Sequence, residues 1–359
     1  MAPAVSGSFR LTVLNPGGHD PEQQFPDGAG DIGPQHAPVN FHAFTASTGG
    51  SFQREVRRAI LEKTPVLLLL RGDFKASERA FAQLKKTGCP VVVSLKETGL
   101  HQIAQQLRDP GSLARFKKLI AAADGCIGIT PEAADVYRSL RTNPDRVAFI
   151  PTPYPVGDSR WDFSRPASGR SGIFVGTREF NVPSRNHLAT MLLAQSLSER
   201  TNEHVTVFNA NGRSGEKLLA ALNFPAKRLN IIRRKLHYPD YLREVSRHKL
   251  VLQLDASFVP GQVAGDALLC GLPCVGGNGA IDRIAFEDIC GVGRSIAEIG
   301  GIAERLIQNR TYYDPVVAKS QKRAVDQLSF SVIAKQLEKF FRQSQIGMPL
   351  GVRYPIASK

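Results

Sequence analysis

Short apolar segments alternate with amphipathic segments along the first half of the chain. Residues 65–70 (PVLLLL), 90–95 (PVVVSL) and 125–130 (GCIGIT) are almost continuously apolar, which is typical of strands buried on both faces. Between them, residues 75–88 and 112–123 carry apolar side chains at helical spacing. This alternation predicts a parallel sheet with helices on both of its faces.

The chain before these strands has a less regular pattern. Residues 9–18 predict one short strand, and residues 15–38, which are rich in Pro, Gly and Asp, predict a long loop. Residues 39–47 (VNFHAFTAS) predict a strand, on which we interpret His42 as a core residue. Residues 49–63 predict a helix, because their apolar side chains share one face.

The alternation restarts after residues 152–172, which are rich in Pro, Gly and Ser and hold the only Trp. Apolar strands are expected at 172–177, 204–209, 229–234, 249–255 and 273–277, with amphipathic helices between them. From about residue 296 onwards the pattern is helical.

The two alternations predict two doubly wound, Rossmann-like α/β domains that face a cleft. We place the domains at 1–155 and 172–330, a linker at 156–171, and a C-terminal helix and tail at 331–359 that packs back on the first domain. A chain of 359 residues is long enough for two cores. Ligands of such sheets bind beyond the carboxyl ends of the strands, so the cleft is the expected site.

The net charge of the chain indicates which classes of binding partner to expect. A net charge of +14 favours an anionic ligand such as a nucleotide, a nucleic acid or a membrane surface, and a well-solvated basic surface is the simpler alternative. The sequence shows no RNA-recognition, KH, zinc or helix-turn-helix pattern, so we expect no nucleic-acid partner. The five cysteines form no CxxC pair, which predicts reduced thiols and no metal site. The N-terminus has no apolar signal segment, which favours a cytoplasmic location.

One glycine motif lacks the context that its chemistry needs. Gly28, Gly30 and Gly33 form a GxGxxG pattern, but Pro26 precedes it and Pro34 follows it. A dinucleotide site requires a strand directly before the glycines and a helix directly after them. We therefore do not interpret these glycines as a cofactor site.

Four segments of the chain carry a resemblance to a known family. They are GGSFQREVRRAIL (49–61), the stretch from AADGCIGIT to VAFIPTPYPV (122–156), FVGTREFNVPSRN (174–186) and SFVPGQVAGDALLCGLPCVGG (257–277). Together they resemble GT-B-fold glycosyltransferases, most of all the large retaining family 4 (group 1). The resemblance covers roughly residues 40 to 345. It implies an acceptor-side domain at 1–155 and a nucleotide-sugar donor domain at 172–330.

The segment 257–277 resembles the family's donor-binding loop and helix. The first N–H groups of a helix have no intrahelical acceptor, and the helix dipole makes that end positive. The resemblance implies that Gly261, Gln262 and Val263 offer these amides to the donor diphosphate. It also implies that Asp266 acts as the catalytic acid that holds a donor hydroxyl group.

Basic residues of the second domain fit the same donor. Gly176, Arg178 and Arg185 correspond to the family's diphosphate-binding loop, where arginine binds phosphate in a fork. His237 and the neighbouring Lys235 correspond to its nucleoside-binding loop, although a solvated loop histidine is an equally good interpretation. Such a site neutralises the leaving group without a metal.

The acceptor side is defined less clearly. The resemblance places Gly49, Gly50 and Glu97 at the acceptor side of the cleft. The sequence departs from the family's pattern at one position that bears on catalytic activity. The first of the family's two acidic residues corresponds to Phe258, and the second corresponds to Asp266.

The resemblance implies a cytoplasmic, metal-independent hexosyltransferase that retains configuration and needs no cofactor beyond its nucleotide-sugar donor. A glycan or a lipid-linked acceptor fits it, the latter with peripheral contact at the inner face of a membrane through basic helix faces. Two alternatives stay open. One is a non-catalytic GT-B binding or scaffold protein, which Phe258 favours, and the other is a nucleotide-sugar epimerase of the same fold.

Overall fold

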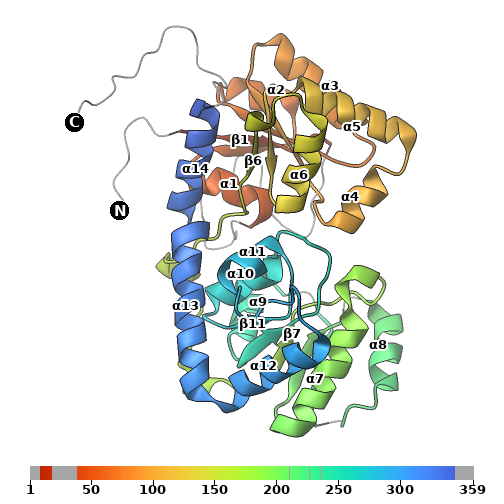
Figure 1. Cartoon of the computed structure of the whole chain (residues 1–359), viewed down its shortest axis with the longest axis vertical. Helices are drawn as coiled ribbons and strands as arrows, with labels where there is room; N and C mark the ends of the chain where they lie inside the picture. Colours follow the sequence, from red (N-terminus) through yellow and green to blue (C-terminus); the bar gives the residue numbers. More distant parts are fainter. Residues whose placement is uncertain (1–8, 18–38, 210, 226, 235, 344–359) are drawn as a thin grey trace, which may run out of the picture.

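The computed structural model consists of two α/β domains, one above the other in Figure 1. It describes residues 9–17, 39–209, 211–225, 227–234 and 236–343. The glycine motif at 28–33, most of the expected loop at 15–38 and the end of the chain lie outside the described residues. The prediction of two parallel-sheet domains is confirmed.

The first sheet has six parallel strands in the order β2-β1-β3-β4-β5-β6. The strands are β1 (Thr12–Leu14), β2 (Ser51–Gln53), β3 (Val66–Leu70), β4 (Val91–Leu95), β5 (Gly125–Gly128) and β6 (Val147–Phe149). The helices are α1 (Asn40–Thr48), α2 (Val56–Leu61), α3 (Lys75–Lys86), α4 (Leu100–Gln106), α5 (Pro110–Ala122) and α6 (Pro131–Leu140).

Strand β3 shows why these apolar runs are strands. Val66, Leu68 and Leu70 pack into a core with α3, α5 and α6, while Leu67 and Leu69 pack into a second core on the opposite face with α1. Successive side chains of a strand point to opposite faces, so a strand with helices on both sides is apolar at every position.

The expected strand at 39–47 is wrong, because these residues form helix α1. The helix is buried on almost every side, so its apolar residues show no helical period. The ring of His42 is buried as expected and stacks on Phe52, with 3.7 Å between ring centroids. Phe52 itself belongs to β2, a strand that falls inside the helix expected at 49–63; three residues are too few for a period to identify a strand.

The second sheet has five parallel strands in the order β11-β10-β7-β8-β9. The strands are β7 (Ile173–Val175), β8 (Val205–Phe208), β9 (Leu229–Ile232), β10 (Leu250–Leu252) and β11 (Cys274–Val275). The helices of this domain are α7 (His187–Thr201), α8 (Gly212–Ala221), α9 (Tyr238–Val245), α10 (Gln262–Leu269) and α11 (Ala280–Ala285). All five expected strands are present, and they share one large core with the surrounding helices.

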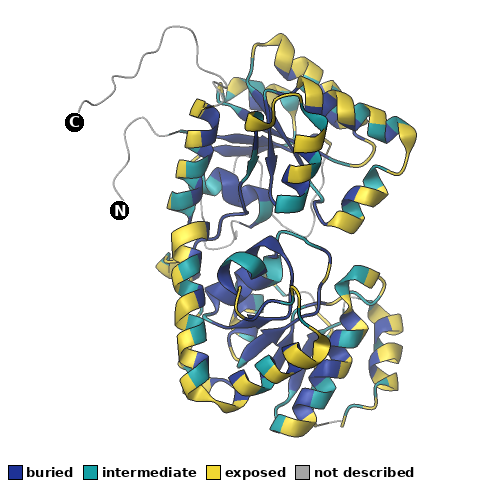
Figure 2. Cartoon of the chain, in the orientation of Figure 1, coloured by how far each residue is buried: buried dark blue, intermediate teal, exposed yellow. Residues whose placement is uncertain are grey.

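Three helices end the described chain: α12 (Ile296–Gln308), α13 (Arg310–Leu328) and α14 (Phe330–Gln343). Helix α12 packs on α7, and α13 runs along the second domain (Figure 1). Helix α14 continues upwards and buries Ile333 and Leu337 in the core beside α1 of the first domain. The chain therefore crosses between the domains twice, and the two crossings meet where the Tyr154 N–H donates to the Leu328 carbonyl at 2.9 Å. Figure 2 shows that both sheets are buried beneath their helices.

Gly265→Ala should destabilise the protein by about 2 kcal/mol or more, because overpacking a buried site costs about 1–3 kcal/mol. A Cβ atom at Gly265 in α10 would overlap the ring of Tyr154, which is fully buried and cannot move away. The matched control is Gly301→Ala in α12, where a Cβ atom meets nothing within 4 Å. The control should gain up to roughly 1 kcal/mol from helix propensity. Urea unfolding of both variants checks this, and equal stabilities would contradict it.

Candidate functional site

A cavity with a volume of about 850 Å³ lies between the two domains. The carboxyl ends of both sheets open into it, as expected for doubly wound folds. The first domain contributes residues near the ends of β3 and β4, among them Lys96 and Glu97. The second domain contributes the loops after β7, β8, β9 and β10.

The start of helix α10 lies at the wall of this cavity. Gly261 has a φ of +95°, and a Cβ atom there would come within 3.1 Å of the backbone nitrogen of Ile281. Glycine is therefore required for the chain to enter the helix at this position. Gly261, Gln262 and Val263 all line the cavity, so the free N–H groups of this helix end are close to any ligand bound there.

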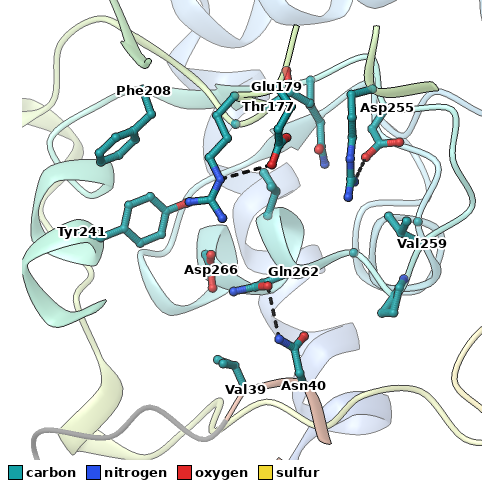
Figure 3. Close-up of a pocket in the computed structure, with 18 of the residues that line it drawn as sticks. Val39, Asn40, Thr177, Glu179, Phe208, Tyr241, Asp255, Val259, Gln262 and Asp266 are labelled. Carbon is teal, nitrogen blue, oxygen red and sulfur yellow. Dashed lines mark hydrogen bonds and ion pairs between the residues drawn. The ribbon is translucent and has the colours of Figure 1, made fainter. Parts of the chain in front are cut away.

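Two arginines of the loop after β7 also line the cavity. Arg178 is about half exposed and lies 3.6 Å from the carboxylate of Glu179 (Figure 3). Arg185 forms an ion pair with the buried carboxylate of Asp255, whose other oxygen accepts a hydrogen bond of 2.8 Å from the N–H of Ser257. Arg185 is therefore held in place, whereas Arg178 remains adjustable. Gly176 lines the same wall at the end of β7.

Asp266 is the first of two buried acids in the cavity wall that form no ion pair; the third buried acid there, Asp255, pairs with Arg185. The hydroxyl group of Tyr238 donates to its Oδ1, and Tyr241 bonds to it as well. Burial raises the pKa of Asp266 to about 7, against the opposing effects of the Tyr238 hydrogen bond and the Arg178 charge. Figure 3 shows Asp266 on the side of the cavity where Tyr241 and Phe208 lie.

Asp282 is the second buried acid, and sequence reasoning did not find it. It lies in α11, lines the cavity and is 1% exposed. Its Oδ1 accepts a hydrogen bond of 2.9 Å from the side-chain amide of Gln253. Burial, and then the charge of Asp255, raise the pKa of Asp282 to about 7. The sequence feature that could have identified Asp282 is its position in the first turn of a helix that follows a glycine-rich turn after β11.

The aromatic side of the cavity holds the residues expected to bind a nucleoside. His237 lines it as the exposed N-cap of α9. Lys235 lies outside the described residues. Phe208 and Tyr241 line the same side and were not anticipated, because single aromatic residues at a strand end or on a helix resemble core positions in sequence.

On the acceptor side, Glu97 lines the cavity, but Gly49 and Gly50 do not. Gly49 ends helix α1 with a φ of +60°. A Cβ atom at Gly50 would overlap the backbone of Leu11, the residue before β1. Local structure explains this Gly-Gly pair, because it lets the chain turn tightly from α1 into β2.

Direct contacts hold the two domains together beside the cavity. Arg283 of α11 forms a bidentate ion pair with Glu132 of α6, at 2.6 and 2.9 Å. The N–H of Leu100 in the first domain donates to the carbonyl of Ser257 at 3.0 Å. The ring of Phe258 lies beneath the Arg283 guanidinium, 5.3 Å from ring centroid to Cζ. Phe258, at the position where the sequence resemblance implied an acid, thus supports a domain contact.

Breaking this contact should loosen the closed arrangement. Glu132→Gln replaces a charge-assisted pair with a neutral hydrogen bond, which we expect to weaken closure by about 1–2 kcal/mol. Small-angle scattering should then show a larger radius of gyration for the variant without ligand. Asp314→Asn, which removes an exposed ion pair with Arg310 on α13, is the matched control and should scatter like the original protein. Identical scattering for both variants would contradict the expectation.

The described residues give no indication of a metal site, a membrane span or a reactive thiol. They contain no cluster of three or more His, Cys, Asp and Glu side chains arranged to hold a metal ion. Within the same residues, no helix is both long enough and apolar enough to cross a membrane. All five cysteines are free thiols, and burial raises the pKa of Cys126 to about 12, which makes it a weak nucleophile.

Solved structures of similar architecture match almost the whole chain. HepE from Anabaena, solved in complex with UDP-glucose, matches with a TM-score of 0.64 at 11% identity, over 93% of this chain and 99% of that one. Sucrose-phosphate synthase from Thermosynechococcus elongatus matches with a TM-score of 0.62 at 13% identity, over 93% and 98% of the two chains. The chain has a GT-B fold. This confirms the fold that the resemblance implied.

A third solved structure also matches almost the whole chain. MnaA from S. aureus, solved with UDP, has a TM-score of 0.53 at 13% identity, over 94% of this chain and 98% of that one. No family model and no curated protein matches the sequence. The similarity therefore shows the fold, and the chemistry has to be argued from the cavity.

Proposed function

We propose that this protein is a glycosyltransferase that moves a sugar from a nucleoside diphosphate-sugar to a hydroxyl group of a glycan or lipid-linked acceptor, with retention. One observation carries the proposal. The two domains of the GT-B fold enclose a cavity between them. The second domain contributes the N-terminus of α10, Arg178 and Arg185 to it, and the first domain contributes the carboxylate of Glu97. The solved complexes of HepE with UDP-glucose and UDP favour a uridine nucleotide as the donor.

The donor's parts find matching chemistry along the cavity. The amides of Gln262 and Val263 and the guanidinium of Arg178 suit a diphosphate, since each offers N–H donors and positive charge. The rings of Phe208 and Tyr241 and the imidazole of His237 suit a nucleoside, because a base stacks well on aromatic side chains.

The proposed reaction breaks one bond and forms another at the anomeric carbon. The bond from this carbon to the β-phosphate oxygen breaks, and the nucleoside diphosphate leaves with the electron pair. Arg178, Arg185 and the α10 amides stabilise the charge that develops on it. The acceptor oxygen bonds to the anomeric carbon, and its proton passes to a phosphate oxygen of the leaving nucleoside diphosphate. Asp266 holds a donor hydroxyl group, and Glu97 is placed to orient the acceptor from the first domain.

A thermal-shift titration with UDP, GDP, ADP and dTDP tests the donor site. One nucleotide should give saturable stabilisation, of about 2.7 kcal/mol at 100 times its dissociation constant. The matching nucleotide-sugars with candidate acceptors then test turnover. No stabilisation by any of the four would overturn the proposal for these donors. Binding without turnover would favour a non-catalytic binding protein.

A nucleotide-sugar epimerase is the second candidate. It is favoured by the presence of the two buried acids, Asp266 and Asp282, in the cavity wall, because epimerisation requires groups that move protons. A protein of the same fold described as a putative UDP-N-acetylglucosamine 2-epimerase, from Listeria monocytogenes, has a TM-score of 0.50 at 14% identity, over 87% of this chain and 81% of that one. Incubation with the donor alone separates the two candidates, because an epimerase converts it without an acceptor.

A further inference from the structure

We propose that Asp282 is a specificity-determining residue that contacts the sugar of the donor. This inference rests on the proposed function, because it assumes that a nucleoside diphosphate-sugar occupies the cavity. The observation behind it is the position of the Asp282 carboxylate against Gly261, at the start of α10.

Asp282 differs in its partners from three other acids of the cavity. Glu179 and Asp255 each pair with an arginine, and Asp266 is bonded by Tyr238. Among the described residues, no Lys, Arg or His side chain forms an ion pair with Asp282, and the charge with the largest effect on it is that of the like-charged Asp255. A buried acid without a cation is costly to a fold. An acid kept in such a place is a candidate for ligand contact.

The Asp282 carboxylate can lie close to the proposed donor site because the residues around it are glycines. A Cβ atom on Gly261 would lie 3.1 Å from its Oδ2, and one on Gly279 would lie 2.7 Å from the same oxygen. A Cβ atom on Gly277 would overlap Oδ1. The carboxylate therefore lies directly against the residue that begins α10, with no side chain between them.

The order of groups in the donor then fixes what meets Asp282. In a nucleoside diphosphate-sugar, the nucleoside and the sugar are attached to opposite ends of the diphosphate. The aromatic residues Phe208 and Tyr241 lie on one side of Gln262, and Asp255, the charged neighbour of Asp282, lies on the other (Figure 3). A diphosphate at the start of α10 with its nucleoside on the aromatic side directs the sugar towards Asp282. A carboxyl group there can hydrogen-bond the sugar hydroxyls.

The test compares UDP with UDP-glucose by isothermal titration at about pH 8, above the pKa of about 7 of Asp282, so that its carboxylate is ionised. Asp282→Asn has the same shape but not the charge, and Asp282→Ser is a second, smaller variant in case the first is misfolded. Both should bind UDP with an affinity within about threefold of the original, while the ratio of UDP-glucose to UDP affinity falls about tenfold, as expected for the loss of one charged hydrogen bond. Asp288→Asn removes a surface carboxylate that pairs with Lys319, and should change neither affinity.

The outcomes separate the inference from the proposed function. If UDP binds and the affinity ratio is unchanged in both variants, Asp282 does not contact the sugar and the proposed donor site stands. If UDP affinity falls together with UDP-glucose affinity, Asp282 shapes the diphosphate site and the inference is wrong. If the unaltered protein binds neither ligand, a uridine donor is excluded, and the inference fails with it.

Discussion

Arg178→Ala is expected to lower the affinity for a nucleoside diphosphate by about 10- to 100-fold without unfolding the protein. A hydrogen bond to a charged group contributes about 1.5–3 kcal/mol, and each 1.4 kcal/mol is tenfold in affinity. Arg178 is about half exposed, and its ion pair with Glu179 is long, at 3.6 Å. Its loss therefore breaks no buried ion pair, and Asp266, which the Arg178 charge also affects, keeps its hydrogen bond from Tyr238, so the protein should still fold.

Arg185 requires a different substitution for the same question. Arg185→Ala would leave the buried carboxylate of Asp255 unpaired, and removing one partner of a buried pair typically costs about 3–5 kcal/mol. Arg185→Lys keeps the charge beside Asp255 and removes only the forked geometry. We expect it to fold normally and to bind the nucleotide more weakly than the original protein.

Titration calorimetry with the nucleotide that gives the thermal shift measures these affinities. Arg200→Ala is the matched control, because it removes an arginine that pairs with Glu304 outside the cavity. Arg200→Ala should bind like the original protein. An equal loss in the control would indicate a general charge effect, and an unchanged Arg178→Ala would remove Arg178 from the diphosphate site.

The sequence predicted the sheets well because parallel strands buried on both faces are apolar at every position. β3 and β4 fall within the apolar runs at 65–70 and 90–95. Helix α1 was missed for the same physical reason, since a helix buried on every side loses the period that distinguishes it from a strand. A continuous apolar run therefore predicted β3 and β4 correctly, but the same kind of run led to the wrong prediction for α1.

The site was predictable where local sequence sets the backbone, and less so where the fold brings distant residues together. Gly261 was predicted from the resemblance, and its φ of +95° explains why a glycine stands at this helix start. Asp255 and Asp282 were missed because their importance depends on contacts with Arg185 and Gln253, which lie far away in the sequence. The Gly-Gly pair at 49–50 shows the converse, since local structure accounts for a motif that resembled a site.

The stability of the protein should depend on pH through two opposing pairs of buried groups. Burial raises the pKa of Asp266 and of Asp282 to about 7, above the ordinary value of 3.8. Burial lowers the pKa of His187 and of His248 to about 4, below the ordinary value of 6.5. All four groups therefore change the free energy of unfolding across the window from about pH 4 to 6.5.

The signs of the two effects are opposite. Between pH 4 and 6.5 each aspartate is protonated in the folded chain and ionised in the unfolded chain, so stability falls as pH rises. In the same window each histidine is neutral in the folded chain and protonated in the unfolded chain, so stability rises with pH. Each group contributes about 1.4 kcal/mol per pH unit, and two against two leave the protein nearly indifferent to pH.

Single substitutions should reveal this balance. Asp266→Asn removes one aspartate, so its stability relative to the original protein should rise by about 2–3 kcal/mol between pH 4.5 and 6.5. His248→Gln, at a buried histidine that bonds Thr206, should shift by a similar amount in the opposite direction. Glu298→Gln is the control, because Glu298 is an exposed carboxyl group whose pKa is lowered, not raised, by its hydrogen bonds to Ser295. Urea unfolding at the two pH values measures all three. Parallel pH dependence for Asp266→Asn and His248→Gln would show that the carboxyl group and the imidazole are not both neutral in the folded protein.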